Sequence, residues 1–215
     1  LGGFQRRADG EALDQLGHFG ADHVRTEQLA GLGVENRLDQ AFRLAERLSR
    51  SRISFDRLYA SDLRRARQTA EPLAQVLGLP IATTPLLREI HVGELAGLTR
   101  AEAEARFPSF LAEAAKDPWN ARRPGGESMA DLARRLQAFL EEVPPGRHLV
   151  VTHGGVIRAA LKLALDLAGD TWRRFHIQNT SITRILYPEN AVLTVADAAH
   201  LEVWADWLSD EDLQG

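Results

Sequence analysis

A histidine at a glycine turn is the first feature of the sequence that could do chemistry. The segment LVVTHGG passes from apolar β-type residues through His153 into Gly154 and Gly155, and a helical repeat follows. Such a turn places free backbone N–H groups and the positive end of a helix dipole beside the histidine, which favours binding of an anion. Taken alone, the segment fits an ordinary strand-to-helix turn with a structural histidine slightly better, because a short glycine motif is weak evidence.

Arginines and one carboxyl group could complete an anion site. In SDLRRARQTAE, Ser61 is a suitable helix N-cap, so Arg64 and Arg65 fall in or just after the first turn. Positive charge there opposes the helix dipole by ~0.3–1 kcal/mol per group, which hints at an anionic partner. Helical periodicity does not separate a ligand-binding arginine from a solvated face. Glu89, in the non-helical segment LREIHVGEL, could act as a general acid beside a phosphate, although an isolated loop glutamate is usually just solvated.

Several other chemistries are excluded by composition. The chain has no cysteine, which excludes thiolate catalysis, disulfides and cysteine-ligated metals, and its histidines show no paired metal-ligand spacing. Walker, dinucleotide-binding and Gly-x-Ser-x-Gly motifs are absent from the sequence. We therefore expect neither a metal nor a cofactor.

Charge and hydropathy limit the class of partner. The formal net charge is −4 and the isoelectric point lies near 6, with no basic stripe that would suit nucleic acid. No apolar run approaches membrane-spanning length, and LGGFQRRADG lacks the apolar core of a signal peptide. We expect a cytoplasmic protein that binds neither nucleic acid nor membrane.

The elements that must position these residues alternate between helix and strand from Leu38 onward. Apolar spacing predicts helices over 38–50, 62–78, 129–143 and 155–165, with short helical pieces over 99–116. Strands are predicted over 55–61 and 147–153, and two further β segments over 181–187 and 191–197. This alternation favours one three-layer α/β domain in which helices cover both faces of a mostly parallel sheet.

Residues 1–37 do not follow the pattern. They hold seven of the seventeen glycines, and their apolar residues keep neither a helical nor a strand period. The sequence therefore divides into an aperiodic segment, 1–37, and a domain, 38–215.

Five segments, read in order, resemble the histidine phosphatase superfamily, which has the phosphoglycerate mutase-like fold. They are LYASDLRRARQTAE, LREIHVGELAGLT, RRPGGES, LVVTHGGVIR and NTSITRILY. The resemblance implies that Arg65 binds phosphate and that Glu89 is the general acid that protonates the leaving group. It implies that His153 is the second active-site histidine, which clamps the phosphoryl oxygens with help from the helix that Gly154 opens. Asn179 is implied to lie close to the pocket.

The chain departs from this family at its N-terminal end. Family members carry an Arg-His-Gly motif there, at the end of the first strand, and its histidine is the nucleophile that becomes phosphorylated; this tripeptide does not occur in the chain. His18 and His23 lack the preceding arginine and β-type run. In GELAGLT, Ala96 stands where the family often has Glu or Gln, which we expect to alter substrate contacts. Without the missing strand, the sheet could expose an edge beside Val151, or the aperiodic segment could refill the gap.

Three functional hypotheses follow. The first is a phosphomonoester hydrolase that acts on a small phosphorylated metabolite through a phosphohistidine, with residues 1–37 being misread or replaced sequence. The second is an inactive relative that binds phosphorylated ligands or a partner protein. The third makes His18 an unusual nucleophile. The short span between Glu89 and His153 favours a phosphatase over a phosphoglycerate mutase, because the resemblance associates the mutase branch with longer loops there.

Overall fold

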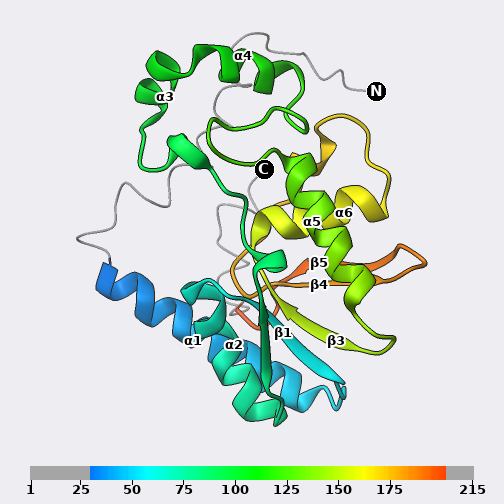
Figure 1. Cartoon of the computed structure of the whole chain (residues 1–215). Helices are drawn as coiled ribbons and strands as arrows, with labels where there is room; N and C mark the ends of the chain where they lie inside the picture. Colours follow the sequence, from blue (N-terminus) through cyan, green and yellow to red (C-terminus); the bar gives the residue numbers. More distant parts are fainter. Residues whose placement is uncertain (1–29, 202–215) are drawn as a thin grey trace, which may run out of the picture.

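The computed structural model describes residues 30–201, whose elements alternate between helix and strand (Figure 1). The helices are α1 (Ala30–Arg50), α2 (Arg64–Leu77), α3 (Arg100–Arg106), α4 (Pro108–Lys116), α5 (Met129–Glu142) and α6 (Gly154–Ala164). The strands are β1 (Arg57–Ser61), β2 (Ile81–Thr84), β3 (His148–Val151), β4 (Ile182–Leu186) and β5 (Ala191–Asp197). Short 3-10 turns lie at Pro85–Leu87, Gly93–Leu95 and Thr171–Arg174.

The first helix begins earlier than the sequence pattern predicted. Apolar spacing placed its start at Leu38, whereas α1 begins at Ala30, inside the segment read as aperiodic. Extending an existing helix adds one hydrogen bond per ordered residue and needs no new nucleus, so a helix can run beyond its amphipathic part.

A parallel sheet in the order β2-β1-β3 forms the middle layer. Central Leu58 pairs with Ile81 on one side and with Leu149 on the other. Leu58 packs among side chains of α1 and α2, while the next residue, Tyr59, meets the ring of Phe139 in α5 at 5.3 Å between ring centroids. Figure 1 shows α1 and α2 on one side of this sheet and α5 and α6 on the other. The predicted helix-covered, parallel α/β architecture is confirmed.

The last two strands form a sheet of their own. β4 and β5 pair antiparallel, with an irregular register near Arg184. Within residues 30–201, β3 has β1 along one edge and no strand along the other, and Val150 in the middle of β3 is 36% exposed. An open strand edge beside Val151 was one of two outcomes expected for a chain without the Arg-His-Gly strand; the other, refilling by the N-terminal segment, lies outside the described residues.

Of the two apolar clusters that residues 30–201 form, the larger lies under the loop that carries Glu89. Leu87 and Ile90, on either side of Glu89, are 0% and 6% exposed and pack with Met129, Leu132 and other residues of α5. Burial of these two neighbours fixes the loop to α5 and leaves the Glu89 side chain to face the turn at the start of α6. In the described part of the chain, no helix combines the length and the apolar character that crossing a membrane requires.

Candidate active site

Parallel pairing brings two turns to the same edge of the sheet. β1 ends at Ser61 and β3 ends just before Thr152, so the residues that follow the two neighbouring strands meet. The hydroxyl of Ser61, fully buried, lies 2.9 Å from Nε2 of His153. The prediction that Ser61 caps α2 is wrong: the N-cap is Leu63, with no side-chain cap, and the Ser61 hydroxyl accepts from the Leu63 amide at 3.3 Å and faces the histidine instead.

Arg65 reaches the same histidine from the first turn of α2. Its Nε donates to Nδ1 of His153 at 3.2 Å. An arginine can only donate, so Nδ1 accepts and the ring proton lies on Nε2, which donates to Ser61. Burial and the charge of Arg65 lower the pKa of His153 to about 4. The imidazole is therefore neutral at pH 7, and both of its nitrogens are hydrogen-bonded within the protein.

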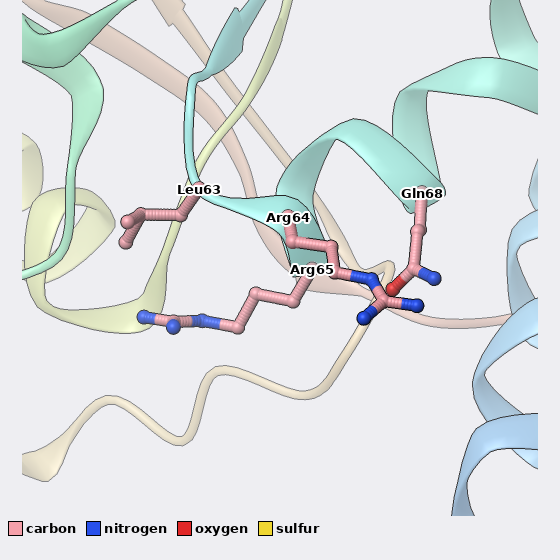
Figure 2. Close-up of a pocket in the computed structure, with 4 residues that line it drawn as sticks. All are labelled: Leu63, Arg64, Arg65 and Gln68. Atoms are coloured by element: carbon pink, nitrogen blue, oxygen red, sulfur yellow. The ribbon is translucent and has the colours of Figure 1, made fainter.

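Helical periodicity does not distinguish the roles of Arg64 and Arg65, but the directions of their side chains in the structure do. Figure 2 shows the Arg65 side chain extending away from those of Arg64 and Gln68, which lie together on the other side of the helix start. These three residues and Leu63 line an open pocket of about 500 Å³. Arg65 therefore joins this pocket to His153, whereas the Arg64 side chain lies beside that of Gln68.

Glu89 lies at the N-terminus of α6. Its Oε2 accepts from the Gly155 amide at 3.0 Å, and its Oε1 accepts from the Ile90 amide at 2.9 Å. A Cβ on Gly155 would lie 2.2 Å from Oε1, so only glycine allows this approach. The sequence analysis expected an anion at this helix terminus. The carboxylate of Glu89 occupies part of it, at the Gly155 amide, two residues after His153.

Gly154 is the first residue of α6 and lies against a further basic group. A Cβ built on it would be 3.3 Å from Nη1 of Arg158, which donates through Nε to the Phe175 carbonyl at 3.0 Å. Arg158 is thus held beside the turn that contains His153.

Two arginines that sequence reasoning missed, Arg123 and Arg158, carry positive charge close to Glu89, and a third, Arg173, lies near Arg123. Arg123, 9% exposed, has its pKa lowered by burial to about 10, and the opposing charge of Glu89 acts on both Arg123 and Arg158. Burial likewise lowers the pKa of Arg173, whose charge in turn acts on Arg123. Arg123 and Arg158 lie in RRPGGES and THGGVIR, two segments already singled out, so their position in those motifs was the available signal.

The remaining candidates stay apart from these contacts. Asn179 lies exposed in the turn before β4, and none of the hydrogen bonds that join Arg65, Glu89 and His153 to their partners includes it. His18 and His23 lie outside the described residues. Between residues 30 and 201, no group of three or more histidines and carboxylates is placed to hold a metal ion.

Comparison with known proteins decides the family. The sequence model of the histidine phosphatase superfamily (branch 1) matches residues 35–197. The chain belongs to this superfamily. A probable phosphoglycerate mutase, GpmB of Yersinia pestis, is 32% identical over 76% of the chain and 80% of its own length.

Solved structures of similar fold include a phosphatase. A mycobacterial glucosyl-3-phosphoglycerate phosphatase, solved with inorganic phosphate, is 28% identical, covers 77% of this chain and 87% of its own, and superposes with a TM-score of 0.64. YhfR of Bacillus stearothermophilus is 26% identical, with 77% and 84% coverage and a TM-score of 0.66. Phosphatase-like and mutase-like proteins both occur among these relatives, and Arg65, Glu89 and His153 lie in the matched region.

Proposed function

We propose that this protein is a phosphomonoester hydrolase that acts on a small phosphorylated metabolite. The observation that carries the proposal is the meeting of Arg65, Glu89 and His153 at the carboxyl edge of β1 and β3. A phosphoryl group placed there would replace the bond between Arg65 and Nδ1 of His153 and would accept from Arg65. Its negative charge would favour uptake of a proton on Nδ1, after which His153 would donate to it as well. Such electrostatic positioning is the main protein contribution to phosphoryl transfer.

Glu89 is proposed as the proton donor of this reaction. As the bond between phosphorus and the leaving oxygen breaks, a proton on the Glu89 carboxyl would pass to that oxygen, and the phosphoryl group would move to a histidine nitrogen. Water would then attack the phosphohistidine and give its proton back to Glu89. Arg123 and Arg158, buried and partly buried beside Glu89, favour a leaving group that itself carries negative charge. This agrees with the phosphoglycerate compounds in the relatives' names.

The nucleophilic histidine is the part of this proposal that residues 30–201 do not supply. His153 has both ring nitrogens engaged, and the hydrogen bonds of the described residues bring no second histidine to Arg65 or His153. We propose that residues 1–37 are misread or replaced sequence. Translating the upstream DNA in all three frames should reveal a strand that ends in Arg-His-Gly, and its absence from every frame would refute this explanation.

The test of activity uses two adjacent arginines as a matched pair. With p-nitrophenyl phosphate as substrate and vanadate as ligand, Arg65→Ala and His153→Ala should weaken vanadate binding. Arg64→Ala should not, because Arg65 is the arginine that bonds to His153 and the Arg64 side chain extends toward Gln68 (Figure 2). Glu89→Ala should remove turnover of an alkyl phosphate such as glycerol phosphate, and reduce that of p-nitrophenyl phosphate much less, while vanadate still binds. Equal losses in the two arginine variants would argue against the proposed phosphate site.

An inactive, phosphate-binding relative is the second candidate function. It is favoured by the absent Arg-His-Gly motif and by the satisfied ring of His153. This candidate predicts vanadate or phosphate binding that depends on Arg65 and His153, without turnover; robust turnover that is lost in Glu89→Ala would exclude it.

Two further proposals can be tested alongside. Acid-labile phosphate on His18 after mixing with substrate would support an unusual nucleophile, and an unchanged rate in His18→Ala would end that idea. A cytoplasmic location, with no nucleic-acid or membrane partner, is tested by cell fractionation.

A further inference from the structure

A partly buried ion pair lies behind the loop that carries Glu89. Arg135 of α5 donates through Nε to Oε1 of Glu127 at 3.1 Å and through Nη2 to Oε2 at 3.0 Å. The two side chains are only 17% and 23% exposed. A two-bond arginine–carboxylate pair fixes orientation as well as distance, because the guanidinium plane must match the carboxylate plane.

This pair also holds the backbone on both sides of Glu89. Nη1 of Arg135 donates to the carbonyl of Leu86 at 2.6 Å and to that of Arg88 at 2.9 Å, before Glu89 in the chain. After Glu89, the His91 amide donates to Oε2 of Glu127 at 2.9 Å. The loop is therefore held at three backbone groups by one pair of side chains, with Glu89 between them.

Two glycines allow the turn that carries Glu127 to pack closely against the same loop. The Glu127 amide donates to the His91 carbonyl at 2.8 Å, and a Cβ on Gly126 would lie 2.3 Å from that oxygen. A Cβ on Gly93 would lie 2.0 Å from the Pro124 carbonyl, which accepts from the Glu94 amide at 2.8 Å. Side chains at either glycine would push the two segments apart and pull Glu127 from the loop.

The pair of Arg135 and Glu127, called the brace below, lies on and just before α5, a helix that is capped at its start and buried along one face. Ser128 and Asp131 form a capping box at the start of α5, and Leu132 and Leu136, on either side of Arg135 along the helix, are buried in the larger core. Burial alone would raise the pKa of Glu127, but the bonds from Arg135 and from the His91 amide outweigh it and hold this pKa below its usual value. The carboxylate thus stays ionised and the pair intact at neutral pH.

We propose that Arg135 and Glu127 are positioning residues that hold Glu89 at the N-terminus of α6, where it can deliver a proton to the leaving group. The assignment of Glu89 as proton donor rests on the proposed function; the positional effect does not. Neither Arg135 nor Glu127 touches the phosphoryl group in this scheme. They act through the backbone of 86–91 and so through the two hydrogen bonds of the Glu89 carboxylate.

The Gly155 amide is a reporter of this position that needs no catalysis. It donates to Oε2 of Glu89, so its proton chemical shift and its hydrogen-exchange protection respond to the carboxylate. Glu89→Ala calibrates the loss of the bond, for which we expect protection to fall on the order of tenfold. Arg135→Lys keeps the charge but loses the two-bond geometry of the guanidinium, and Glu127→Gln keeps the shape but loses the charge. In both variants, the chemical shift and the exchange protection of the Gly155 amide should move toward their values in Glu89→Ala.

A second ion pair provides the matched control. Arg47 of α1 donates to both carboxylate oxygens of Asp197 in β5, with side-chain exposures of 32% and 31%, and holds no part of the Glu89 loop. Arg47→Lys should leave the Gly155 resonance and its exchange rate unchanged. If Arg135→Lys and Glu127→Gln also leave Gly155 unchanged while Glu89→Ala moves it, or if Glu89→Ala itself does not move it, the proposal is wrong.

Leaving-group dependence separates positioning from a general loss of structure. An alkyl phosphate needs a proton on its departing oxygen far more than p-nitrophenyl phosphate does, because the alkoxide is the poorer leaving group. The two brace variants should lose about tenfold or more in kcat on glycerol phosphate and much less on p-nitrophenyl phosphate; an equal loss on both refutes the role in proton delivery. Absence of turnover in the unmodified protein would instead count against the proposed function, and the Gly155 measurement would still decide the positional effect.

Discussion

The neutral state of His153 has a measurable consequence for stability. In the unfolded chain this histidine has the ordinary histidine pKa of 6.5, whereas burial and Arg65 lower its pKa to about 4 in the fold. As pH falls from 6.5 toward 4, the unfolded state is protonated and the folded state is not, so stability is lost over this window. Between pH 7.5 and pH 5 the difference amounts to about 2 kcal/mol.

Replacement of the histidine isolates this contribution. Gln cannot titrate here, yet its amide can accept from Arg65 and donate to Ser61 as the neutral ring does. Urea unfolding, followed by tryptophan fluorescence at both pH values, should show the unmodified protein losing about 2 kcal/mol more than His153→Gln on acidification. The half-buried His200, whose pKa is also lowered chiefly by burial, titrates in both proteins and cancels in the comparison.

If both proteins lose the same unfolding free energy on acidification, His153 titrates in the fold as it does in the unfolded chain. The neutral ring described above would then be wrong. The NMR titration of the His153 ring in the unmodified protein gives an independent reading: a midpoint near 4 agrees with the structure, and a midpoint near 6.5 contradicts it.

Three further substitutions test packing around the site by urea unfolding. Gly155→Ala should displace the Glu89 carboxylate, since its Cβ would lie 2.2 Å from Oε1, yet change the stability by less than about 1 kcal/mol, because that oxygen ends a flexible side chain and alanine favours the helix; a larger loss would show that the carboxylate cannot move. Gly93→Ala should cost more than Gly97→Ala, because both have positive φ but only Gly93 would place its Cβ 2.0 Å from a backbone carbonyl. Leu58→Ala, at a fully buried position in the central strand, should cost ~2–5 kcal/mol, and a loss below about 1 kcal/mol would show that β1 is not the core strand.

Local patterns in the sequence were sufficient for the layered core. The alternating strand around Leu58 and the apolar face of α5 follow from spacing alone, and both occur where that spacing predicted them. The family resemblance, in turn, chose Arg65 over Arg64 and assigned Glu89 a role, and the structure brings both beside the turn of His153. The prediction of the layered core rests on interactions between residues close in the chain, and the choice of site residues rests on ordered motifs.

What the sequence did not reveal depends on contacts between distant segments. Ser61 was read as a helix cap because a serine before a helix usually is one, and only the pairing of β1 with β3 shows that it meets His153 instead. Arg135 belongs to no motif that the sequence singles out, yet it reaches two backbone carbonyls of a loop far from it in sequence. No periodicity encodes such contacts, because they are set by the packing of whole elements.

The candidate site is assembled so that each group has its own support. Arg65 is fixed by the junction of β1 and α2, His153 by the junction of β3 and α6, and Glu89 by the ion pair on α5. None of these supports involves the edge of β3 that has no strand beside it within residues 30–201. On the proposed function, phosphate binding and the position of Glu89 can therefore persist without a further strand, whereas the proposed phosphoryl transfer would require a nucleophile beside that edge. Loss of transfer with retained binding is the outcome that this separation favours for any chain in which the strand is missing.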